Sequence, residues 1–204
     1  MGKGIVETLL NKKGVEIVGA VVRGQKIGKS MYELTGIERG DRPDIIAGSY
    51  EDVIKEGAAD VVIIATDSYT RTSFDKIKYC LERKINVIST AEEMAYPQAQ
   101  SPELAKELDR IAKENGVTVL GTGINPGLIM DLLVITLTGA CIDVESIKAE
   151  RINNLSPFGP SVMHGQGVGI SVEEFNRRVE ENDLDGHIGF PESITMIADA
   201  LGWK

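Results

Sequence analysis

The sequence is poor in the two residue types that most often build disulfides and metal centres. Its 204 residues include only two cysteines, Cys80 and Cys141, and two histidines, His164 and His187. So few histidines argue against a histidine-based metal site, and we expect no metal. Both cysteines stand in apolar helical patterns, which favours buried free thiols over a disulfide.

An excess of positive charge and long apolar runs are also missing. The 22 basic residues are outnumbered by 31 acidic ones, and the net charge of −9 argues against a nucleic acid or an anionic membrane as the main partner. No apolar run is long enough to span a bilayer, and no basic segment followed by an apolar one opens the sequence. We therefore expect a cytoplasmic protein that binds a small molecule.

What the sequence does contain is an alternation of strand and helix patterns. A continuous apolar run such as 61–65 is typical of a strand that is covered on both faces. Strands are expected over 15–22, 61–65, 85–90 and 117–120. Helices are expected over 2–12, 30–34, 50–55 with Ser49 as cap, 70–84, and from Ser101 to Asn115 with Gly116 as its end. This order predicts an α/β fold with a doubly wound parallel sheet of the Rossmann type.

The pattern changes after about residue 143. Residues 144–153 read as a longer strand, and residues 156–169 are rich in glycine, proline and serine. Two helical patterns follow, near 171–182 and 191–201. We therefore predict a Rossmann-like domain over residues 1–143, and the beginning of a second α+β domain for substrate binding and dimerisation over residues 144–204.

The segment VTVLGTGINPGLIMD, residues 117–131, points most directly to a function. An apolar run ends in Gly-Thr-Gly, and Asn-Pro-Gly then leads into an apolar helical pattern. A strand, a glycine-rich turn and a helix that starts near a proline bring backbone N–H groups and partial positive charge toward a ligand. Ligands bind at such carboxyl ends of strands in open α/β sheets, so the segment predicts a cofactor site.

Both ends of the sequence depart from a complete dinucleotide-binding enzyme. Such a sheet normally opens with a strand that leads into G-x-G-x-x-G, whereas Met1–Gly4 runs straight into the first helix. We expect that the first strand is missing, so that the sheet closes up, a partner chain fills the gap, or the sequence is a fragment. The other end, at Gly202–Lys204, leaves the second domain too short for a core of its own.

Four segments together carry a resemblance to a known family. They read MGKGIVETLLNKKGVEIVGAVV, INVISTAEEMAYP, GTGINPGLIMDLL and ERINNLSPFGPSVMHGQGVG. Together they resemble the 2,4-diaminopentanoate dehydrogenases of the native amine dehydrogenase group, whose N-terminal domain is like that of dihydrodipicolinate reductase and whose members are longer. The resemblance implies NAD(P)-dependent oxidative deamination of a 4-amino group, as in ornithine degradation, with reductive amination of 2-amino-4-oxopentanoate as the reverse reaction. It also implies a homodimer.

Glu92 and Glu93 are the candidate catalytic residues. They follow the strand that ends at Thr90, at the edge of the sheet where ligands bind. A carboxylate there can hold ammonia or an ammonium group, move protons and stabilise the iminium that accepts hydride. The alternative is an acid pair at the start of a helix, favoured by the helix dipole. The resemblance implies one catalytic glutamate in this motif, and the sequence does not distinguish the two.

The candidate cofactor-binding residues stand near the ends of strands. Thr66, Asp67 and Ser68 occupy a position that passes beside the nicotinamide ribose in such folds, although Asp67 is more simply interpreted as a helix cap. Asn125 could donate a hydrogen bond to the carboxamide or the substrate, although Asn-Pro-Gly is also a good turn. The complete set is Gly2, Gly4, Arg23, Lys26, Thr66, Asp67, Thr90, Asn125 and Gly127.

Arg23 and Lys26 indicate which nicotinamide cofactor is preferred. An NAD-selective site usually carries Asp or Glu at the end of the second strand for the ribose hydroxyls. Here Arg23, with Lys26 nearby, suits a 2′-phosphate instead, so NADP is expected over NAD. The alternative is a solvated basic loop.

Three residues of the second part are candidates for substrate binding. Arg151 and Asn153 could bind a substrate carboxylate, Arg151 by a bidentate contact. His164, within SVMHGQG, could bind the carboxylate or transfer a proton. A plain surface position is the favoured alternative for Arg151, and a loop position without function stays open for His164.

The residues and the resemblance together predict an NAD(P)-dependent amine dehydrogenase that takes an amine or ketone substrate and ammonia. One alternative is another oxidoreductase of the same fold, such as dihydrodipicolinate reductase, although the basic, histidine-rich substrate motif of that family is not found. The other alternative is an inactive fragment that binds at most a nucleotide or a partner chain.

Overall fold

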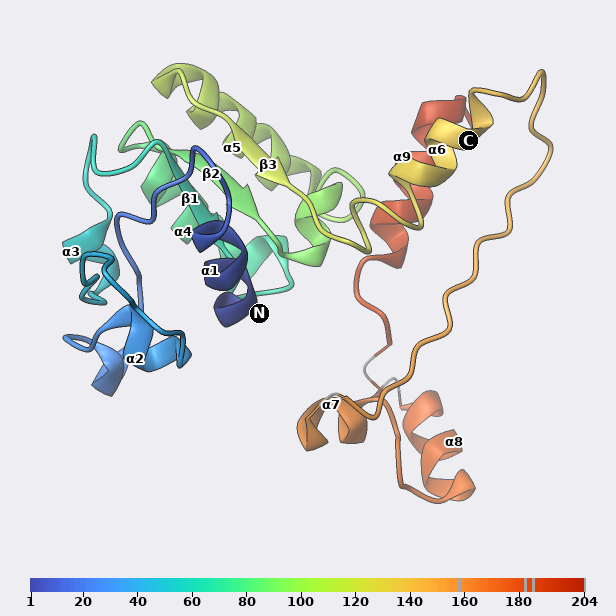
Figure 1. Ribbon diagram of the computed structural model, residues 1–204. Coiled ribbons are helices and arrows are strands. Elements are labelled where there is room, and N and C mark those ends of the chain that lie inside the picture. Colours follow the sequence, from blue (N-terminus) through green and yellow to red (C-terminus); the bar gives the residue numbers. More distant parts are fainter. Residues whose placement is uncertain (158, 182, 185, 204) are drawn as a thin grey trace.

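A parallel sheet organises the first part of the protein. The computed structural model describes residues 1–157, 159–181, 183–184 and 186–203, and in these residues the sheet has three strands in the order β1-β2-β3 (Figure 1). The strands are β1 (Val61–Ile64), β2 (Asn86–Ser89) and β3 (Val119–Gly121), and both pairings are parallel. The connecting helices α4 (Thr70–Leu81) and α5 (Pro102–Asn115) pack against each other. The predicted α/β fold with a parallel, Rossmann-like sheet is confirmed.

The core lies between the sheet and these two helices. Val62, Val87 and Val119 are neighbours in register on the face that packs against the helices. On the opposite face, Val61 and Leu120 remain 44% and 51% exposed. The prediction that the 61–65 strand is covered on both faces is therefore wrong, because β1 lies at an edge of the sheet and the helices cover one face. The buried cluster consists of Ile54, Ile64, Ile77, Cys80, Leu81, Ile85, Val87, Ala91, Met94, Leu108, Ile111 and Ala112.

Residues 15–22 were expected to form a strand, and this expectation is wrong. The segment is extended, but in the described part of the chain its backbone pairs only with Gly48, which donates to Ala20 O at 3.0 Å and accepts from Val22 N at 3.0 Å. A strand needs a neighbour along its whole length to satisfy its N–H and C=O groups. Here one residue supplies the pairing, so no ladder forms.

The remaining predicted helices of the first part are confirmed. They are α1 (Gly2–Leu10), α2 (Met31–Thr35) and α3 (Tyr50–Val53), and a short 3-10 helix, η1 (Gly24–Lys26), stands between the first two. Ser49 caps α3 as expected, since its side chain accepts a hydrogen bond from Asp52 N at 3.2 Å. Ser101 occupies the cap position of α5, but its side chain makes no cap hydrogen bond.

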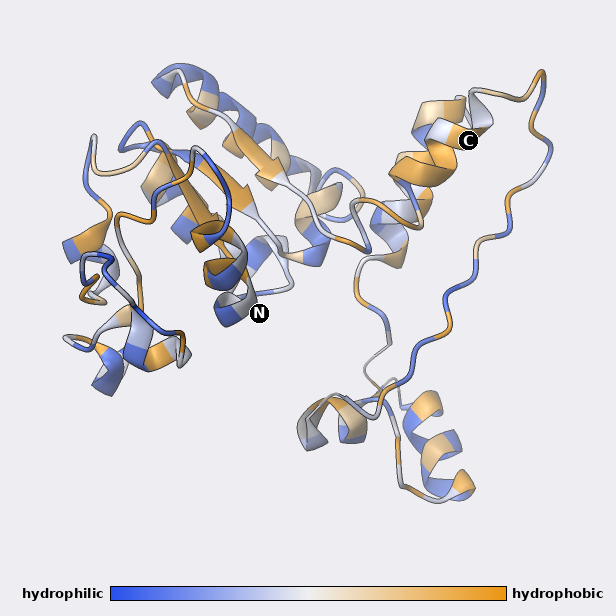
Figure 2. Cartoon of the chain, viewed as in Figure 1, coloured by the Kyte–Doolittle hydropathy of each residue, from blue (hydrophilic) through white to orange (hydrophobic). Residues whose placement is uncertain are grey.

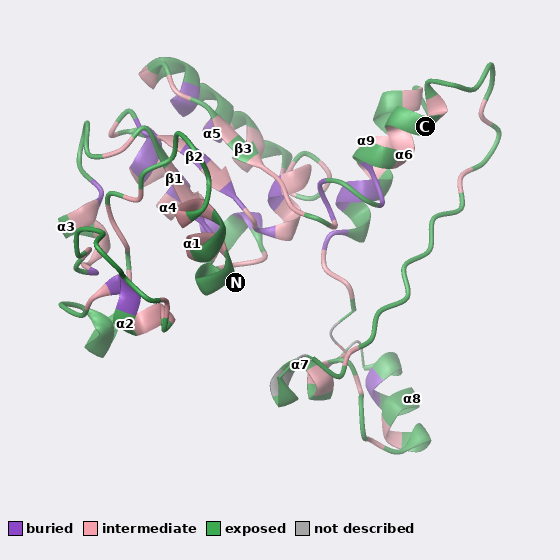
Figure 3. Cartoon of the chain, in the orientation of Figure 1, coloured by how far each residue is buried: buried purple, intermediate pink, exposed green. Residues whose placement is uncertain are grey.

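The described residues after β3, called here the second part, form helices and extended connections. α6 (Leu132–Thr138) packs against α9 (Phe190–Leu201), whereas α7 (Pro160–Gly165) and α8 (Val172–Glu180) lie apart from them (Figure 1). The two helices predicted near 171–182 and 191–201 are confirmed. Apolar residues of α6 and α9 extend onto the exposed surface (Figures 2 and 3).

Residues 144–153 do not form the expected strand. They are extended and largely exposed, and Ile152 is 97% exposed (Figure 3). No strand pairs with them in the part of the chain that the structure describes. Partial alternation of apolar and polar residues is compatible with an extended backbone, but a strand also requires a partner. The proposed boundary at residue 143 stays a prediction.

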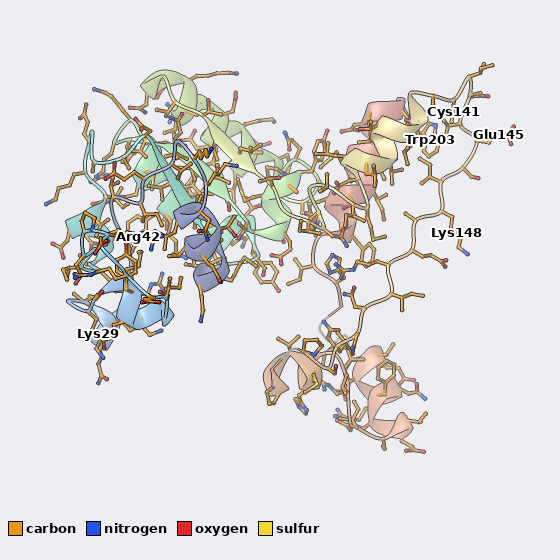
Figure 4. All side chains as sticks on the ribbon, viewed as in Figure 1. Lys29, Arg42, Cys141, Glu145, Lys148 and Trp203 are labelled. Atoms are coloured by element: carbon orange, nitrogen blue, oxygen red, sulfur yellow. The ribbon has the colours of Figure 1, made fainter. Side chains whose placement is uncertain are left out.

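The two cysteines have different environments. Cys80 is fully buried, whereas Cys141 is exposed beyond the end of α6, so the expectation of a buried thiol is wrong for Cys141 (Figure 4). Both are free thiols, as predicted. Among the described residues, no helix combines the length and the apolar character needed to cross a membrane.

Candidate functional site

The two candidate catalytic glutamates begin a 3-10 helix, η2 (Glu92–Ala95), that directly follows β2. η2 packs against the end of β3, and Gly121 makes this contact possible. A Cβ on Gly121 would lie 1.6 Å from Met94 O, so any other residue would force the two backbones apart. The glycine of the sequence motif therefore serves to bring the glutamates to the carboxyl edge of the sheet.

Glu92 and Glu93 have different surroundings. The Glu93 carboxylate accepts a hydrogen bond from Thr70 N at 2.7 Å, and Glu93 N donates to Ser68 O at 3.1 Å. Glu93 is therefore tied to the start of α4. Glu92 instead lines a cavity at the carboxyl edge of the sheet. The structure thus distinguishes the two glutamates, which the sequence did not: Glu93 is hydrogen-bonded to the start of α4, and Glu92 lines a cavity.

The cavity that Glu92 lines has a volume of about 180 Å³. It is formed by the chain after β1, the chain after β2 and the start of α1. Its lining residues are Met1, Ala65, Thr66, Asp67, Ser68, Thr90 and Glu92. The hydroxyl of Thr90 donates to Met1 Sδ at 3.3 Å, which places the N-terminus of α1 beside the end of β2. The structure therefore brings together Thr66, Asp67, Thr90 and Glu92 of the predicted site.

Gly2 and Gly4 lie at the open end of α1. A Cβ on either residue would meet nothing within 4 Å, so their surroundings are free for a ligand. The first N–H groups of a helix have no partner within the helix and carry partial positive charge, which suits a phosphate. The role of these two glycines in cofactor binding stays a prediction.

Asp67 forms an ion pair with Lys76 of α4. The Thr66 hydroxyl joins them, since it donates to Asp67 at 2.9 Å and accepts from Lys76 Nζ at 3.1 Å. Burial raises the pKa of Asp67, but the hydrogen bonds from Lys76 and Thr66 outweigh it and lower the pKa below its usual value. The alternative that Asp67 caps α4 is wrong, because Tyr69 takes the cap position without a side-chain hydrogen bond.

A larger cavity of about 420 Å³ lies on the other side of this ion pair. Arg23 and Lys76 contribute positive charge to it, and Glu51 and Asp75 contribute negative charge. The lining is completed by Val21, Val22, Gly24, Ile27, Ser49, Tyr50 and Tyr79. Lys26 is exposed in η1 and does not belong to this lining. Sequence reasoning missed Lys76, because a lysine within an amphipathic helix normally indicates a solvent-facing position.

The 117–131 segment does not form the expected ligand cradle. Gly123 and Gly127 are needed for contacts within the chain: a Cβ on Gly127 would lie 2.4 Å from Gly123 N, and Gly127 also has φ +117°. The N–H of Gly127 donates to Asp131 at 2.7 Å, and Asp131 also caps α6, which begins at Leu132 rather than beside Pro126. A buried carboxylate thus occupies the helix start that we expected to face a ligand.

Asn125 precedes a cis peptide bond to Pro126, and its side chain donates to Met130 Sδ at 3.4 Å. Its backbone acts to raise the pKa of His187, a residue that sequence reasoning did not select. Gly189 explains this proximity, because a Cβ there would lie 2.5 Å from Pro126 Cγ and 3.3 Å from Glu92 Cβ. The segment that precedes α9 therefore packs directly beside the candidate catalytic residue.

The predicted substrate-binding residues are spread over the second part. Arg151 lies 3.3 Å from His187, measured between Nη2 and Nδ1. Asn153 is exposed on the same extended segment. His164 is exposed in α7, where its backbone carbonyl accepts from Arg178 of α8 at 3.1 Å. Figure 1 shows α7 well away from the sheet, so the structure does not bring His164 to Glu92.

The fold and this site define a class of protein. A parallel α/β sheet carries, at its carboxyl edge, an open helix N-terminus, polar strand ends, a basic residue by the second cavity and a free carboxylate. These residues fit a dinucleotide: helix N–H groups for the pyrophosphate, hydroxyls for a ribose, and Arg23 for the adenosine end. The class is therefore that of α/β proteins that bind a ligand at the carboxyl edge of a parallel sheet.

The family follows from comparison with known proteins. The sequence model of the family described as "Dihydrodipicolinate reductase, N-terminus" matches residues 1–120, and that of "2,4-diaminopentanoate dehydrogenase C-terminal domain" matches residues 128–204. The chain therefore belongs to the family with the dihydrodipicolinate reductase N-terminal domain, and membership implies a nicotinamide cofactor, NAD or NADP. The resemblance predicted from the sequence is confirmed.

Two known proteins are similar over nearly the whole chain. The 2,4-diaminopentanoate dehydrogenase of Acetoanaerobium sticklandii is 67% identical over 204 residues, which are 100% of this chain and 58% of the relative. The solved amine dehydrogenase of Mycobacterium smegmatis is 31% identical with a TM-score of 0.73, and the match covers 98% of this chain and 58% of that one. The chain thus spans 58% of the length of each of these relatives.

Proposed function

We propose that this protein is an NAD(P)-dependent amine dehydrogenase that oxidatively deaminates 2,4-diaminopentanoate. In reverse it would aminate 2-amino-4-oxopentanoate with ammonia. The observation that carries the proposal is the Glu92 carboxylate in the cavity at the carboxyl edge of the sheet. The 67% identity to a 2,4-diaminopentanoate dehydrogenase supports the choice of substrate.

Glu92 would manage the protons of the reaction. When bound, the nicotinamide accepts the hydride that leaves C4 of the amine. Glu92 takes a proton from the substrate ammonium group beforehand and passes it to solvent, and the carboxylate that this restores stabilises the iminium that hydride loss creates. It then takes a proton from the water that adds to the iminium carbon, and ammonia leaves as the ketone forms. Glu93 would act as a positioning residue, because its hydrogen bond with Thr70 N holds η2 against α4.

We further propose that the cofactor lies across both cavities. Gly2 and Gly4 would approach its pyrophosphate, and Thr66, Asp67 and Thr90 would line the nicotinamide end. Asp67 lines the smaller cavity and Lys76 lines the larger one. Their ion pair therefore stands between the cavities and would fix the position of the cofactor along them.

NADP is the proposed preference. Arg23 lines the larger cavity, where its guanidinium suits a 2′-phosphate. Replacing Arg23 by alanine should raise the Michaelis constant for NADPH about tenfold to a hundredfold and leave that for NADH nearly unchanged. If the wild-type protein uses NADH with the lower Michaelis constant, Glu51 and Asp75 would instead be assigned to the ribose hydroxyls.

A cytoplasmic homodimer that forms through the second part is also proposed. Exposed apolar side chains support this contact: Leu137, Val172 and Ile194 are 63%, 72% and 63% exposed. Light scattering across a concentration series tests it, and a monomer at all concentrations would overturn it.

The decisive test is an assay with 2,4-diaminopentanoate and NADP+ or NAD+, with the release of ammonia measured together with the reduced cofactor. Glu92→Gln should lower kcat at least a hundredfold, since general acid–base catalysis contributes about 10²–10⁴ in rate. Glu93→Gln is the matched control and should retain most activity, because an amide oxygen can still accept from Thr70 N. Activity on dihydrodipicolinate without activity on any amine would favour the alternative reductase.

A further inference from the structure

His187 contacts a basic side chain, and it precedes by two residues Gly189, which packs beside Glu92. Its Nδ1 lies 3.3 Å from Arg151 Nη2, and its Nε2 is buried without a hydrogen-bond partner among the described residues. Burial and the charge of Arg151 lower the pKa of His187, and these effects exceed the opposing effects of the Asn125 backbone and the Glu92 carboxylate. The imidazole is therefore neutral near pH 7, which leaves Nδ1 as an acceptor for Arg151.

The imidazole is held firmly in this place. The ring of Phe190 packs against it edge to face, with centroids 5.2 Å apart. Gly189, two residues after His187 in the sequence, packs closely against Pro126 and Glu92. His187 therefore has a fixed position relative to both the cis turn and the candidate catalytic carboxylate.

Among the described residues, Arg151 has one side-chain hydrogen-bond partner, His187. Its guanidinium carries five N–H groups, and the contact with His187 uses one of them. The side chain is exposed on the extended segment that also carries Lys148 (Figure 4). Lys148 itself pairs with Glu150. A positioned guanidinium with unused donors is suited to bidentate binding of a carboxylate.

We propose that Arg151, positioned by His187, binds the carboxylate of an amino-acid substrate while Glu92 holds the amino group at its other end. Arg151 contacts His187, and Glu92 packs beside Gly189, two residues further along the chain. A basic and an acidic side chain joined in this way match a molecule with an ammonium group and a carboxylate. The protein would thus select amines that carry a carboxylate over simple amines. This inference rests on the proposed function, and it assigns Arg151 to binding and His187 to positioning.

The test compares 4-aminopentanoate with 2-aminopentane, which differ only in the carboxylate. Equilibrium binding to the cofactor-loaded protein is measured by calorimetry, together with kcat and KM for both amines. Arg151→Ala should weaken binding of 4-aminopentanoate about tenfold to a hundredfold and raise its KM, with kcat and all constants for 2-aminopentane unchanged. Lys148→Ala, which removes one positive charge from the same exposed segment, is the control and should change neither amine.

His187 is tested by two substitutions. His187→Ala should reproduce the KM effect of Arg151→Ala, whereas His187→Gln should restore binding, because an amide oxygen can still accept a hydrogen bond from Arg151. Equal losses for both amines, or no change in Arg151→Ala, would overturn the inference. Absence of turnover with any amine would refute the proposed function. Calorimetry would still test the inferred carboxylate site in that case. The site is excluded if 4-aminopentanoate does not bind, or if it binds the Arg151→Ala variant as tightly as the wild type.

Discussion

The Glu93 carboxylate accepts a 2.7 Å hydrogen bond from the backbone nitrogen of Thr70, the first residue of α4. Glu93 thereby supplies the cap that Tyr69, at the cap position, does not provide. Its neighbour Glu92 lines the cavity at the carboxyl edge of the sheet. Two adjacent acids of one motif thus have separate duties, one structural and one available for chemistry.

Replacing Glu93 by alanine should destabilise the protein. The lost cap leaves Thr70 N without its acceptor, and we expect a loss of about 1 kcal/mol in the free energy of unfolding. Urea denaturation measures this loss. Glu103→Ala is the control, because Glu103 also lies in the first turn of a helix but is exposed and pairs only with Lys106. If the Glu93→Ala variant is as stable as the Glu103→Ala control, the Glu93 carboxylate does not stabilise the protein as a cap of α4.

Gly189→Ala should disturb the packing beside Glu92. An added Cβ would lie 2.5 Å from Pro126 Cγ, and the backbone has φ +101°, which L side chains rarely adopt. We expect a loss of about 1–3 kcal/mol in stability and reduced activity. Gly186→Ala is the matched control, since a Cβ there would meet nothing within 4 Å. The measurement is the denaturation midpoint with kcat/KM, and equal values for the two variants would contradict the assigned contact.

Asp131 is fully buried and joins three elements of the second part. It accepts hydrogen bonds from Gly127 N at 2.7 Å, Leu132 N at 2.6 Å and Ser193 Oγ at 2.9 Å. Asp131→Ala should lower the free energy of unfolding by about 3 kcal/mol, because buried donors lose their acceptor. Ser193→Ala removes one of these bonds and should lower it by about 1 kcal/mol. Denaturant titration compares the two, and similar losses would argue against Asp131 as the centre of this network.

His187 should make stability depend on pH. Its pKa is lowered in the folded protein by burial and by Arg151, with Glu92 and the Asn125 backbone opposing. The unfolded chain, with a histidine pKa of about 6.5, then binds more protons than the folded chain. Stability should therefore be at its full value above pH 6.5 and decline as the pH falls below it. Thermal denaturation between pH 5 and 8 measures this decline, and His187→Gln should flatten it in that range; an unchanged profile would show that other groups cause it.

The two thiols should differ in reactivity. Burial raises the pKa of Cys80 and excludes reagents from it, whereas Cys141 is exposed. A disulfide reagent should therefore label one thiol in the native protein and two after denaturation. Cys141→Ser should abolish native labelling. If the Cys141→Ser variant is still labelled rapidly, the hydrophobic core around Cys80 unfolds locally often enough to admit the reagent.

Local patterns in the sequence were sufficient to predict the helices and three strands of the sheet. Amphipathic periodicity, capping serines and terminal glycines act within a few residues, so α4, α5, α8 and α9 could be located from the sequence. The segments 15–22 and 144–153 were interpreted as strands for the same local reasons. Both are extended, but the partner that would make each a strand lies far away in the sequence or is not found in the described residues.

The sequence by itself determined the fold class and the family, because these depend on the order of elements and on motifs that are continuous along the chain. Only the tertiary structure decided that Glu92 lines a cavity whereas Glu93 accepts a hydrogen bond from Thr70 N, that Asp67 pairs with Lys76, and that His187 contacts Arg151. These relationships are contacts between residues that are distant in sequence. A residue's chemistry is set by such neighbours, and the spacing of residues along the chain does not specify them.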